Sequence, residues 1–357
     1  MKRSPVTKKI IKTNNNMFLP RLIPSKGVAM AAAGLMAVAL SSCDSSFVFE
    51  DLRPCVPDYR VRLSYMKNMA NEERASQIQA AEVYAFDKEG KLVTVSKADY
   101  QTLKDNDWTL PLDIERFQDY DLFVWGGLTS ESPFFLDGSR AVTSQEDLAC
   151  HLATDSDEEH PNYSDRKFPG LFHGTTSVSF TVEDGTEERT VPMMKNTNDI
   201  NVLIQKETGA PVEEGYYVVE IVDANGDMDH QNNVSGDEVL YRQHTYTAGD
   251  FRIPDGYGGK EETYAASGQW EFSVARLMEN SDARIRIRLG DSNITIFDDK
   301  LIDLLLSRKP SNMDKQDYLD REDTYYLTFR LRVEEDWLHV SVFVNDWLII
   351  KNNMEWE

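Results

Sequence analysis

Short runs in which hydrophobic and polar side chains alternate recur along most of the chain. Tyr59–Tyr65 is one, and Ala81–Phe86 and Lys91–Val95 are two more, joined by the turn-like Asp87–Gly90. A period of two places successive side chains on opposite faces of a β-strand. The other predicted strands are Trp108–Leu112, Tyr120–Trp125, Ser177–Val182, Asn198–Gln205, Tyr216–Val222, Val239–Tyr246, Trp270–Ala275, Arg284–Leu289, Tyr325–Val333 and Leu338–Val344.

Helical periodicity is scarce. Asn71–Ala81 is compatible with a helix, and Asp298–Arg308 is a better candidate because acidic residues begin it and Arg308 ends it. Many short strands at a spacing of roughly 8–12 residues, with few helices, are typical of β-sandwiches. We therefore expect an all-β fold.

A polar passage divides the predicted strands into two groups. Asp184–Arg189 has the composition of a charged turn, and Lys195–Asn198 is polar before a new strand. We expect an N-terminal β-sandwich domain over residues 43–190 and a C-terminal one over 191–357, each long enough to bury its own core. The acidic stretch Asp155–Arg166 is predicted to be an exposed loop of the first domain.

Charge separates the N-terminus from the rest of the chain. The 357 residues carry a formal net charge of −23, yet residues 1–42 hold seven Lys or Arg side chains and no Asp or Glu. The acidic remainder argues against nucleic-acid binding, which needs a basic face.

The basic N-terminus leads into the apolar stretch Gly27–Leu40. At fourteen residues it is shorter than the roughly 20 that a membrane-spanning helix needs. A basic segment, a short apolar segment and small residues make a secretory signal peptide, predicted here over residues 1–42. Cys43 follows Leu40-Ser41-Ser42, which resembles a bacterial lipobox, so we expect cleavage before Cys43 and its acylation. Acyl chains contribute about 0.8 kcal/mol of membrane affinity per buried CH₂, enough for a lasting anchor when two or three are attached.

Two cysteines remain after Cys43. Cys55 and Cys150 form an even pair in an exported protein, which is compatible with a disulfide worth roughly 4 kcal/mol in the chain-entropy model. Two free, partly buried thiols fit the sequence equally well, and both interpretations stay open.

Catalytic motifs are missing from the sequence. It has no GxSxG, HExxH, Walker or GxGxxG pattern, so we expect neither an enzyme nor a cofactor. Alternate oxygen-bearing side chains at Asp223, Asn225, Asp227 and Asp229 suit Ca²⁺. Met228 stands where an EF-hand needs glycine, and a hairpin turn built on Asn225-Gly226 is the favoured interpretation, with no metal.

Eight segments along the chain form a recognisable series: Phe49–Cys55, Val61–Met69, Val83–Gly90, Tyr120–Gly126, Lys195–Val202, Ala275–Met278, Asp320–Tyr326 and Trp337–Trp347. No single segment is specific, but their order and spacing are. Together they resemble the lipidated fimbrial anchor proteins of the type V pili of Bacteroidota. The one departure is Asp346, where glycine is usual.

The resemblance implies two transthyretin-like β-sandwiches in tandem, in a surface-exposed, lipid-anchored outer-membrane protein that tethers and caps a fimbrium and so supports cell adhesion. Its partners would be shaft or accessory subunits bound by strand addition. In such pili an Arg-specific protease removes the first strand of each shaft subunit, whereas an anchor keeps its first strand and its lipid. Arg53 precedes Pro54, and Arg60 and Arg62 lie within a predicted strand, which fits an uncut anchor.

The C-terminus admits two interpretations. Trp347, Leu348, Ile349 and Ile350 offer a donor strand to a neighbouring subunit, or they form the last native strand before a frayed tail. An alternative function is a surface lipoprotein that binds glycans for nutrient uptake and displays an aromatic platform. Against it, Trp108, Trp125, Trp270 and Trp337 lie in alternating runs, where core packing is the common fate.

Overall fold

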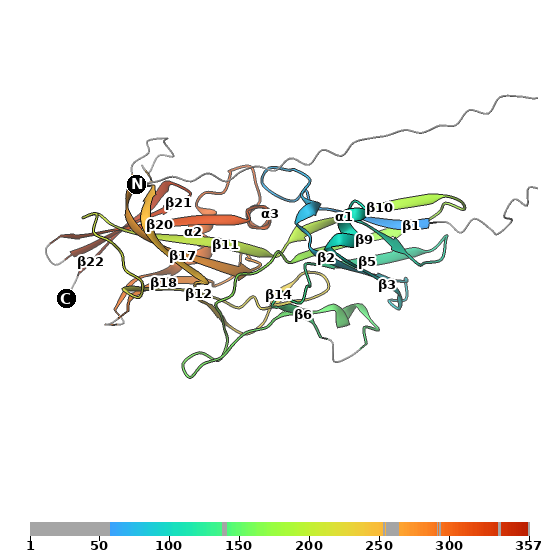
Figure 1. Cartoon of the computed structure of the whole chain (residues 1–357), viewed down its shortest axis with the longest axis horizontal. Coiled ribbons are helices and arrows are strands. Elements are labelled where there is room, and N and C mark those ends of the chain that lie inside the picture. The colour runs from blue at the N-terminus through green and yellow to red at the C-terminus, as the bar shows by residue number, and fades with distance from the viewer. Residues whose placement is uncertain are drawn as a thin grey trace, which may run out of the picture. The chain divides into compact units, whose positions relative to one another are not determined.

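The fold is seen in a computed structural model, which describes residues 58–137, 141–252, 254, 264–290, 292, 294–334 and 337–355. The expected signal peptide, Cys43 and Cys55 therefore lie outside the described residues. Pro54–Glu357 forms one compact unit. Strands dominate it and its helices are few and short, so the predicted all-β class is confirmed (Figure 1).

The first region of this unit is built around one sheet. Its strand order is β3-β2-β5-β9-β10-β1-β4. β1 has β10 on one side, in parallel, and β4 on the other, antiparallel. Tyr59, Val61 and Leu63 of β1 are each 2% exposed or less and lie in the core of this region. The strands are β1 (Asp58–Ser64), β2 (Ala80–Phe86), β3 (Leu92–Asp99), β4 (Thr109–Leu112), β5 (Asp119–Gly126), β9 (Phe172–Ser179) and β10 (Thr186–Lys195), with α1 (Tyr100–Asp105) after β3.

The second region contains two larger sheets. A six-stranded sheet has the order β16-β17-β11-β20-β21-β22, and a five-stranded sheet has the order β19-β18-β12-β15-β8. The strands are β8 (Tyr163–Ser164), β11 (Thr197–Lys206), β12 (Tyr217–Asp223), β15 (Val239–Tyr241), β16 (Thr245–Arg252), β17 (Tyr264–Ala275), β18 (Arg284–Leu289), β19 (Thr295–Lys300), β20 (Thr324–Glu334), β21 (Trp337–Val344) and β22 (Trp347–Glu355); the helices are α2 (Leu301–Leu306) and α3 (Lys315–Arg321).

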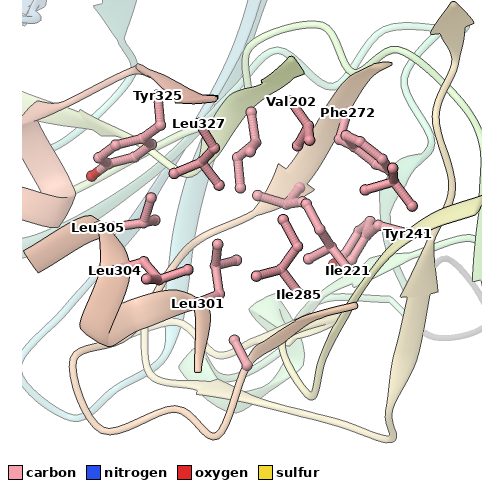
Figure 2. Packing of buried hydrophobic residues seen from close by; sticks show 14 of the residues in the cluster. Val202, Ile221, Tyr241, Phe272, Ile285, Leu301, Leu304, Leu305, Tyr325 and Leu327 are labelled. Atoms are coloured by element: carbon pink, nitrogen blue, oxygen red, sulfur yellow. The ribbon is translucent and has the colours of Figure 1, made fainter. Parts of the chain in front are cut away.

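Alternation along these strands fills the core of the second region. Phe272 from one sheet and Ile221 and Ile285 from the other are fully buried and face a common interior, which Leu301 and Leu305 of α2 complete (Figure 2). Figure 2 also shows Tyr241, Leu304 and Leu327 in this packing. Both faces of the sandwich thus follow from the period of two that the sequence shows.

A small sheet combines segments from both halves of the chain. Its order is β14-β13-β7-β6, with β6 (Phe134–Leu136), β7 (Cys150–Leu152), β13 (Asp227–Met228) and β14 (Val234–Ser235). β8, from within the predicted loop 155–166, pairs with β15 of the second region. The expectation that this loop belongs to the first region is therefore wrong, because part of it adds a strand to the other region's sheet.

The chain passes from the seven-stranded to the six-stranded sheet close to the predicted boundary at residue 190. β10 runs from Thr186 to Lys195 without interruption, and β11 begins at Thr197, so the chain passes from one sheet to the next at Asn196. The charged stretch 184–189 is a turn only at its beginning, because Glu187 faces inward and accepts backbone N–H groups of Thr181 and Val182, each at 2.8 Å. The division into two domains at 190 stays a prediction.

The two helix predictions fare differently. Asn71–Ala81 forms only a 3₁₀ turn, η1 (Ala75–Gln77), before β2 begins. In Asp298–Arg308 the helix is α2, Leu301–Leu306, while Asp298 and Asp299 still belong to β19. A second 3₁₀ turn, η2, spans Gln145–Leu148.

A polar seam joins the two regions. The buried carboxylate of Asp320 in α3 receives two N–H groups of Arg276, at 2.9 and 3.0 Å. Lys67, from the loop that follows β1, reaches the same carboxylate at 2.9 Å. Nearby, the hydroxyl of Tyr65 donates to Asp323 at 2.9 Å. Charges of both regions are thus held at one point.

Candidate subunit-docking site

β22 lies at the edge of the six-stranded sheet. It pairs antiparallel with β21 along its length, from Val344 with Trp347 to Trp337 with Glu355. Among the described residues no strand pairs with its other side. An edge of this kind presents a row of backbone N–H and C=O groups that another chain can use for pairing.

The turn before β22 fixes where this edge begins. Asn345 and Asp346 both have positive φ angles, 46° and 71°, which is the conformation of a two-residue type I′ hairpin turn. Glycine is usual at the second position because it adopts this conformation without strain. Asp346 occupies it here and forms an ion pair with Arg252 of β16, which offsets part of that cost. Asn345 also accepts the backbone N–H of Tyr326 at 3.1 Å.

The predicted donor residues all lie at the start of β22. Ile349 and Ile350 pack against the core of the second region, and the Trp347 ring lies 4.4 Å from the guanidinium of Arg308. Leu348 pairs with Phe343 of β21. The segment thus serves as the last strand of its own sheet, and its donation to a neighbouring subunit stays a prediction.

An apolar mouth opens at the end of the second region where β21 begins and β22 ends. Its volume is about 190 Å³, and it is lined by Lys206, Thr208, Tyr216, Tyr217, Leu289, Ile296, Leu331, Val333 and Leu338. Val333 is 62% exposed, and Tyr216, which also lines the mouth, is 49% exposed. Exposed hydrophobic groups gathered in one place mark a protein interaction surface more often than scattered ones do.

A cation lies at the rim of this mouth. The Lys206 ammonium is 4.2 Å from the centre of the Tyr216 ring. Burial raises the pKa of the neighbouring Tyr217, with a smaller contribution from Tyr216, so the Tyr217 phenol stays neutral at physiological pH. The mouth therefore combines an apolar interior with a single ammonium group among its described lining residues.

β1 carries two arginines that face solvent. Arg62 binds Glu188 at 2.6 Å and Asp107 at 2.8 Å, and Arg60 binds Asp58. The backbone around both is paired on two sides, with β10 and with β4. A protease needs an extended, unpaired segment, so the peptide bonds after Arg60 and Arg62 are protected by the sheet.

The four residues of the predicted calcium interpretation point to four separate places. Asp223 accepts from Ser281 and Ala224, and Asn225 donates to two backbone carbonyls near Ala275. Asp227 contacts His151 at 2.8 Å, and Asp229 accepts the backbone N–H groups of Gln231 and Asn233. Within the described part of the chain no three acidic, His or Cys side chains are grouped to hold a metal ion.

Cys150 is a free thiol buried in β7. Burial raises its pKa, with a smaller contribution from Asp227, so the thiol is protonated at neutral pH. Because Cys55 lies outside the described residues, the disulfide between them stays a prediction.

A buried histidine joins the small sheet to the first region. His173 of β9 contacts the backbone carbonyl of His230 through Nε2 at 2.9 Å, and its ring packs on Trp125. Burial lowers the pKa of His173 to about 4, opposed by its bond to the His230 carbonyl. The imidazole is therefore neutral at pH 7.

Comparison with known proteins bears on the role of this architecture. The sequence matches the model of the fimbrillin-A associated anchor proteins Mfa1 and Mfa2 over residues 53–353. The chain belongs to this family. The match spans both regions, the polar seam and most of β22, so the resemblance expected from the sequence is confirmed.

Solved structures share the fold of this anchor-family protein. A proposed adhesin of Bacteroides thetaiotaomicron is 25% identical, with a TM-score of 0.70, over 85% of this chain and 100% of that one. A proposed adhesin of Bacteroides ovatus is 19% identical, with a TM-score of 0.66, over 85% and 96%. The fimbrial anchor protein Mfa2 of Porphyromonas gingivalis is 17% identical, with a TM-score of 0.59, over 84% and 100%. No curated protein matches the chain.

The sequence did not reveal the apolar mouth of this family member. Its lining comes from the ends of six strands and the turns beside them, spread from Lys206 to Leu338, so no local pattern marks it. The only signal was Val333, a β-branched residue at the polar end of an alternating run. Among the described residues no helix is both long and apolar enough to cross a membrane.

Proposed function

We propose that this protein is the anchor, or an accessory subunit, of a fimbrium and is held in the outer membrane by lipid on Cys43. Membership of the fimbrial anchor family and the likeness to an adhesin support a role in fimbria and adhesion. In this proposal the protein is a structural subunit and not an enzyme.

The position of β1 is the observation that carries the anchor role. A shaft subunit must lose its first strand so that a neighbour can fill the groove. Here β1 lies inside a seven-stranded sheet, with Tyr59, Val61 and Leu63 buried in the core. A strand held on two sides and packed on the core stays in place, so the chain remains continuous from the lipid to the second region.

The free edge of β22 is where a fimbrial subunit would attach. Strand addition satisfies the unpaired backbone groups of an edge and gives specificity through side-chain pockets. The apolar mouth lies where β22 ends and offers such a pocket for a hydrophobic side chain of the added strand. The first and second regions would then have separate tasks, attachment to the membrane and attachment to the fimbrium.

Two measurements test the tether. Cells fed labelled palmitate should incorporate it into the wild-type protein and not into Cys43→Ser, and only the wild type should stay in the outer-membrane fraction. N-terminal sequencing of the surface form should give no chain that begins after Arg53, Arg60 or Arg62. A chain that begins after one of these arginines would make the protein a shaft subunit.

A pair of variants tests the docking edge. Val333→Asp places a charge in the apolar mouth, whereas Val93→Asp places one on the exposed edge strand β3 of the first region. Fimbrial subunits should co-purify with Val93→Asp as with the wild type, and less with Val333→Asp. Deletion of Asn352–Glu357 should leave the protein folded; fimbriae that stay attached and normal in length after it would contradict the role of β22.

A further inference from the structure

A second recess lies on the outer face of the six-stranded sheet, away from the docking edge of β22. Its volume is about 460 Å³, within the range of small-molecule sites. Its floor is formed by β11, β17 and β20, and its walls by the end of β16 and the turn between β21 and β22. We call it the face groove and define it by Asn201, Phe251, Gln269, Tyr326, Thr328 and Asn345.

We propose that the face groove binds a neutral saccharide. This function is separate from anchoring and does not depend on the edge of β22. The side chains of the groove, its charge and the state of its backbone support it in turn.

The groove places an exposed aromatic ring beside side chains that can form hydrogen bonds. Tyr326 is 57% exposed, and it stands on β20 two residues before Thr328 and therefore on the same face. A sugar ring has an apolar C–H face that packs on an aromatic ring and hydroxyl groups that need partners in the plane around it. Tyr326 supplies the first, and Asn201, Gln269 and Asn345 surround it with amides.

Thr328 is the most informative of these groups. The residue is only 7% exposed, lines the groove, and its hydroxyl makes no hydrogen bond with any described residue. The hydroxyl oxygen itself is not fully buried, so it can be reached from the groove. Its hydroxyl is thus available to a ligand hydroxyl in the floor of the groove.

Charge excludes the anionic saccharides. The guanidinium in the groove, Arg252, is already held by Asp346. Glu322 and Asp346 place two carboxyl groups along the groove. A sulfated or carboxylated sugar would be repelled by these carboxyl groups and by the net charge of −23 on the chain. A neutral sugar would not be repelled.

The backbone beneath the groove argues for a ligand that needs side chains only. β11 pairs on both sides, with β17 and with β20, so its N–H and C=O groups are used within the sheet. An extended peptide would find no row of free backbone groups here, as it does at the edge of β22. A saccharide needs none.

The test is titration calorimetry of the full-length lipoprotein in detergent with neutral tetrasaccharides of glucose, galactose, mannose and N-acetylglucosamine, and with a heparin tetrasaccharide. We expect at least one neutral sugar to bind and heparin not to bind. Tyr326→Ala should weaken that binding by about tenfold, as truncation of a central contact does. Tyr216→Ala is the matched control, because Tyr216 is 49% exposed and lies in the apolar mouth instead.

Thr328→Val separates binding from folding. The substitution keeps the shape and removes a hydroxyl that has no partner, so the melting temperature should stay unchanged while affinity falls by about threefold. The proposal fails if no neutral sugar binds, or if Tyr326→Ala and Thr328→Val bind as the wild type does. A fimbrial subunit whose capture is lost in Tyr326→Ala, without any sugar binding, would assign the groove to a protein and also overturn it.

Discussion

The first and the last strands of this protein have opposite surroundings. β1 is interior, paired with β10 and β4, and three of its side chains are buried in the core of the first region. β22 is an edge strand with β21 as its one described neighbour, and Trp347 at its start is 39% exposed. The backbone of the first described strand is thus paired on both sides, whereas the last described strand has one side open.

Each region uses a parallel pair to hold its first strand. β1 runs parallel to β10 in the first region, and β11 runs parallel to β20 in the second. The first region ends with β10, whereas the second continues through β21 and β22. The last strand of the first region therefore lies inside its sheet, whereas the last strand of the second region lies at an edge.

Deletion of β1 should destabilise the protein far more than deletion of β22. Without Asp58–Ser64 the first region loses the strand pairing of β1 with β10 and with β4. It also loses the burial of Tyr59, Val61 and Leu63, and each of these side chains contributes about 1.5–3 kcal/mol. The first region should therefore not fold. Without Trp347–Glu357 the protein should still fold, with a lower melting temperature. Near-UV circular dichroism distinguishes the two, and a cooperative melt of the β1 deletion would show that β1 is dispensable.

Asp320→Asn should lower the free energy of unfolding by about 3–5 kcal/mol, because it leaves Arg276 buried without its charged partner; it also removes the carboxylate that Lys67 contacts from the first region. Urea unfolding measures this loss. Asp58→Asn is the control: its partner Arg60 is well exposed, so the loss of that pair should leave the free energy of unfolding nearly unchanged. Equal losses in the two variants would contradict the structural role of the seam.

His173 should make stability depend on pH. Its pKa in the folded protein is about 4, below the roughly 6.5 of an unfolded chain, so the unfolded state binds more protons between these values. The contribution, about 3 kcal/mol, is present above pH 6.5 and is lost as the pH falls toward 4. The groups that face the ring are Arg276, Asp229 and His230, and the control variant His173→Gln keeps all of them.

Urea midpoints at pH 7 and pH 5 measure this dependence. The drop on acidification should be smaller in His173→Gln than in the wild type, because glutamine does not titrate. An equal drop in both would assign the pH dependence to other groups.

Val333→Ser should have the smallest effect on stability, within about 0.5 kcal/mol, since Val333 is 62% exposed. Its effect on subunit capture should be clear, because it makes the apolar mouth polar. Thermal unfolding and co-purification from outer membranes measure the two effects. A large loss of stability would show that Val333 belongs to the core and not to a docking surface.

The sequence predicted the strands well where one face is buried. The sequence predicted β2 from the apolar cluster that includes Val83 and Tyr84. It predicted β17 from the alternation of Phe272 and Val274 with polar residues. The sequence missed β10 altogether, because Glu187 and Glu188 suggest a turn when their backbone and Arg62 partners are unknown. Short strands such as β8 and β13 carry no periodic signal, since their pairing is decided by distant segments.

The candidate sites were harder to predict for the same reason. Trp125 and Trp270 are buried as expected, but Trp337 is 43% exposed because β21 begins at the open end of the sheet. Asp346 departs from the glycine of its family and still forms the turn, with Arg252 as a partner from another strand. Such contacts depend on the order of strands in the sheet, which local sequence does not encode.

The parallel arrangement of β1 and β10 has a mechanical consequence. If the proposed attachments hold, a pull on the fimbrium would reach β10 through its C-terminal end at Lys195, and the lipid on Cys43 would pull β1 by its N-terminal end at Asp58. In a parallel pair these two ends lie at opposite extremities, so the strands are drawn past each other lengthwise. All the backbone hydrogen bonds between β1 and β10 then bear the load together, in shear, instead of breaking one after another.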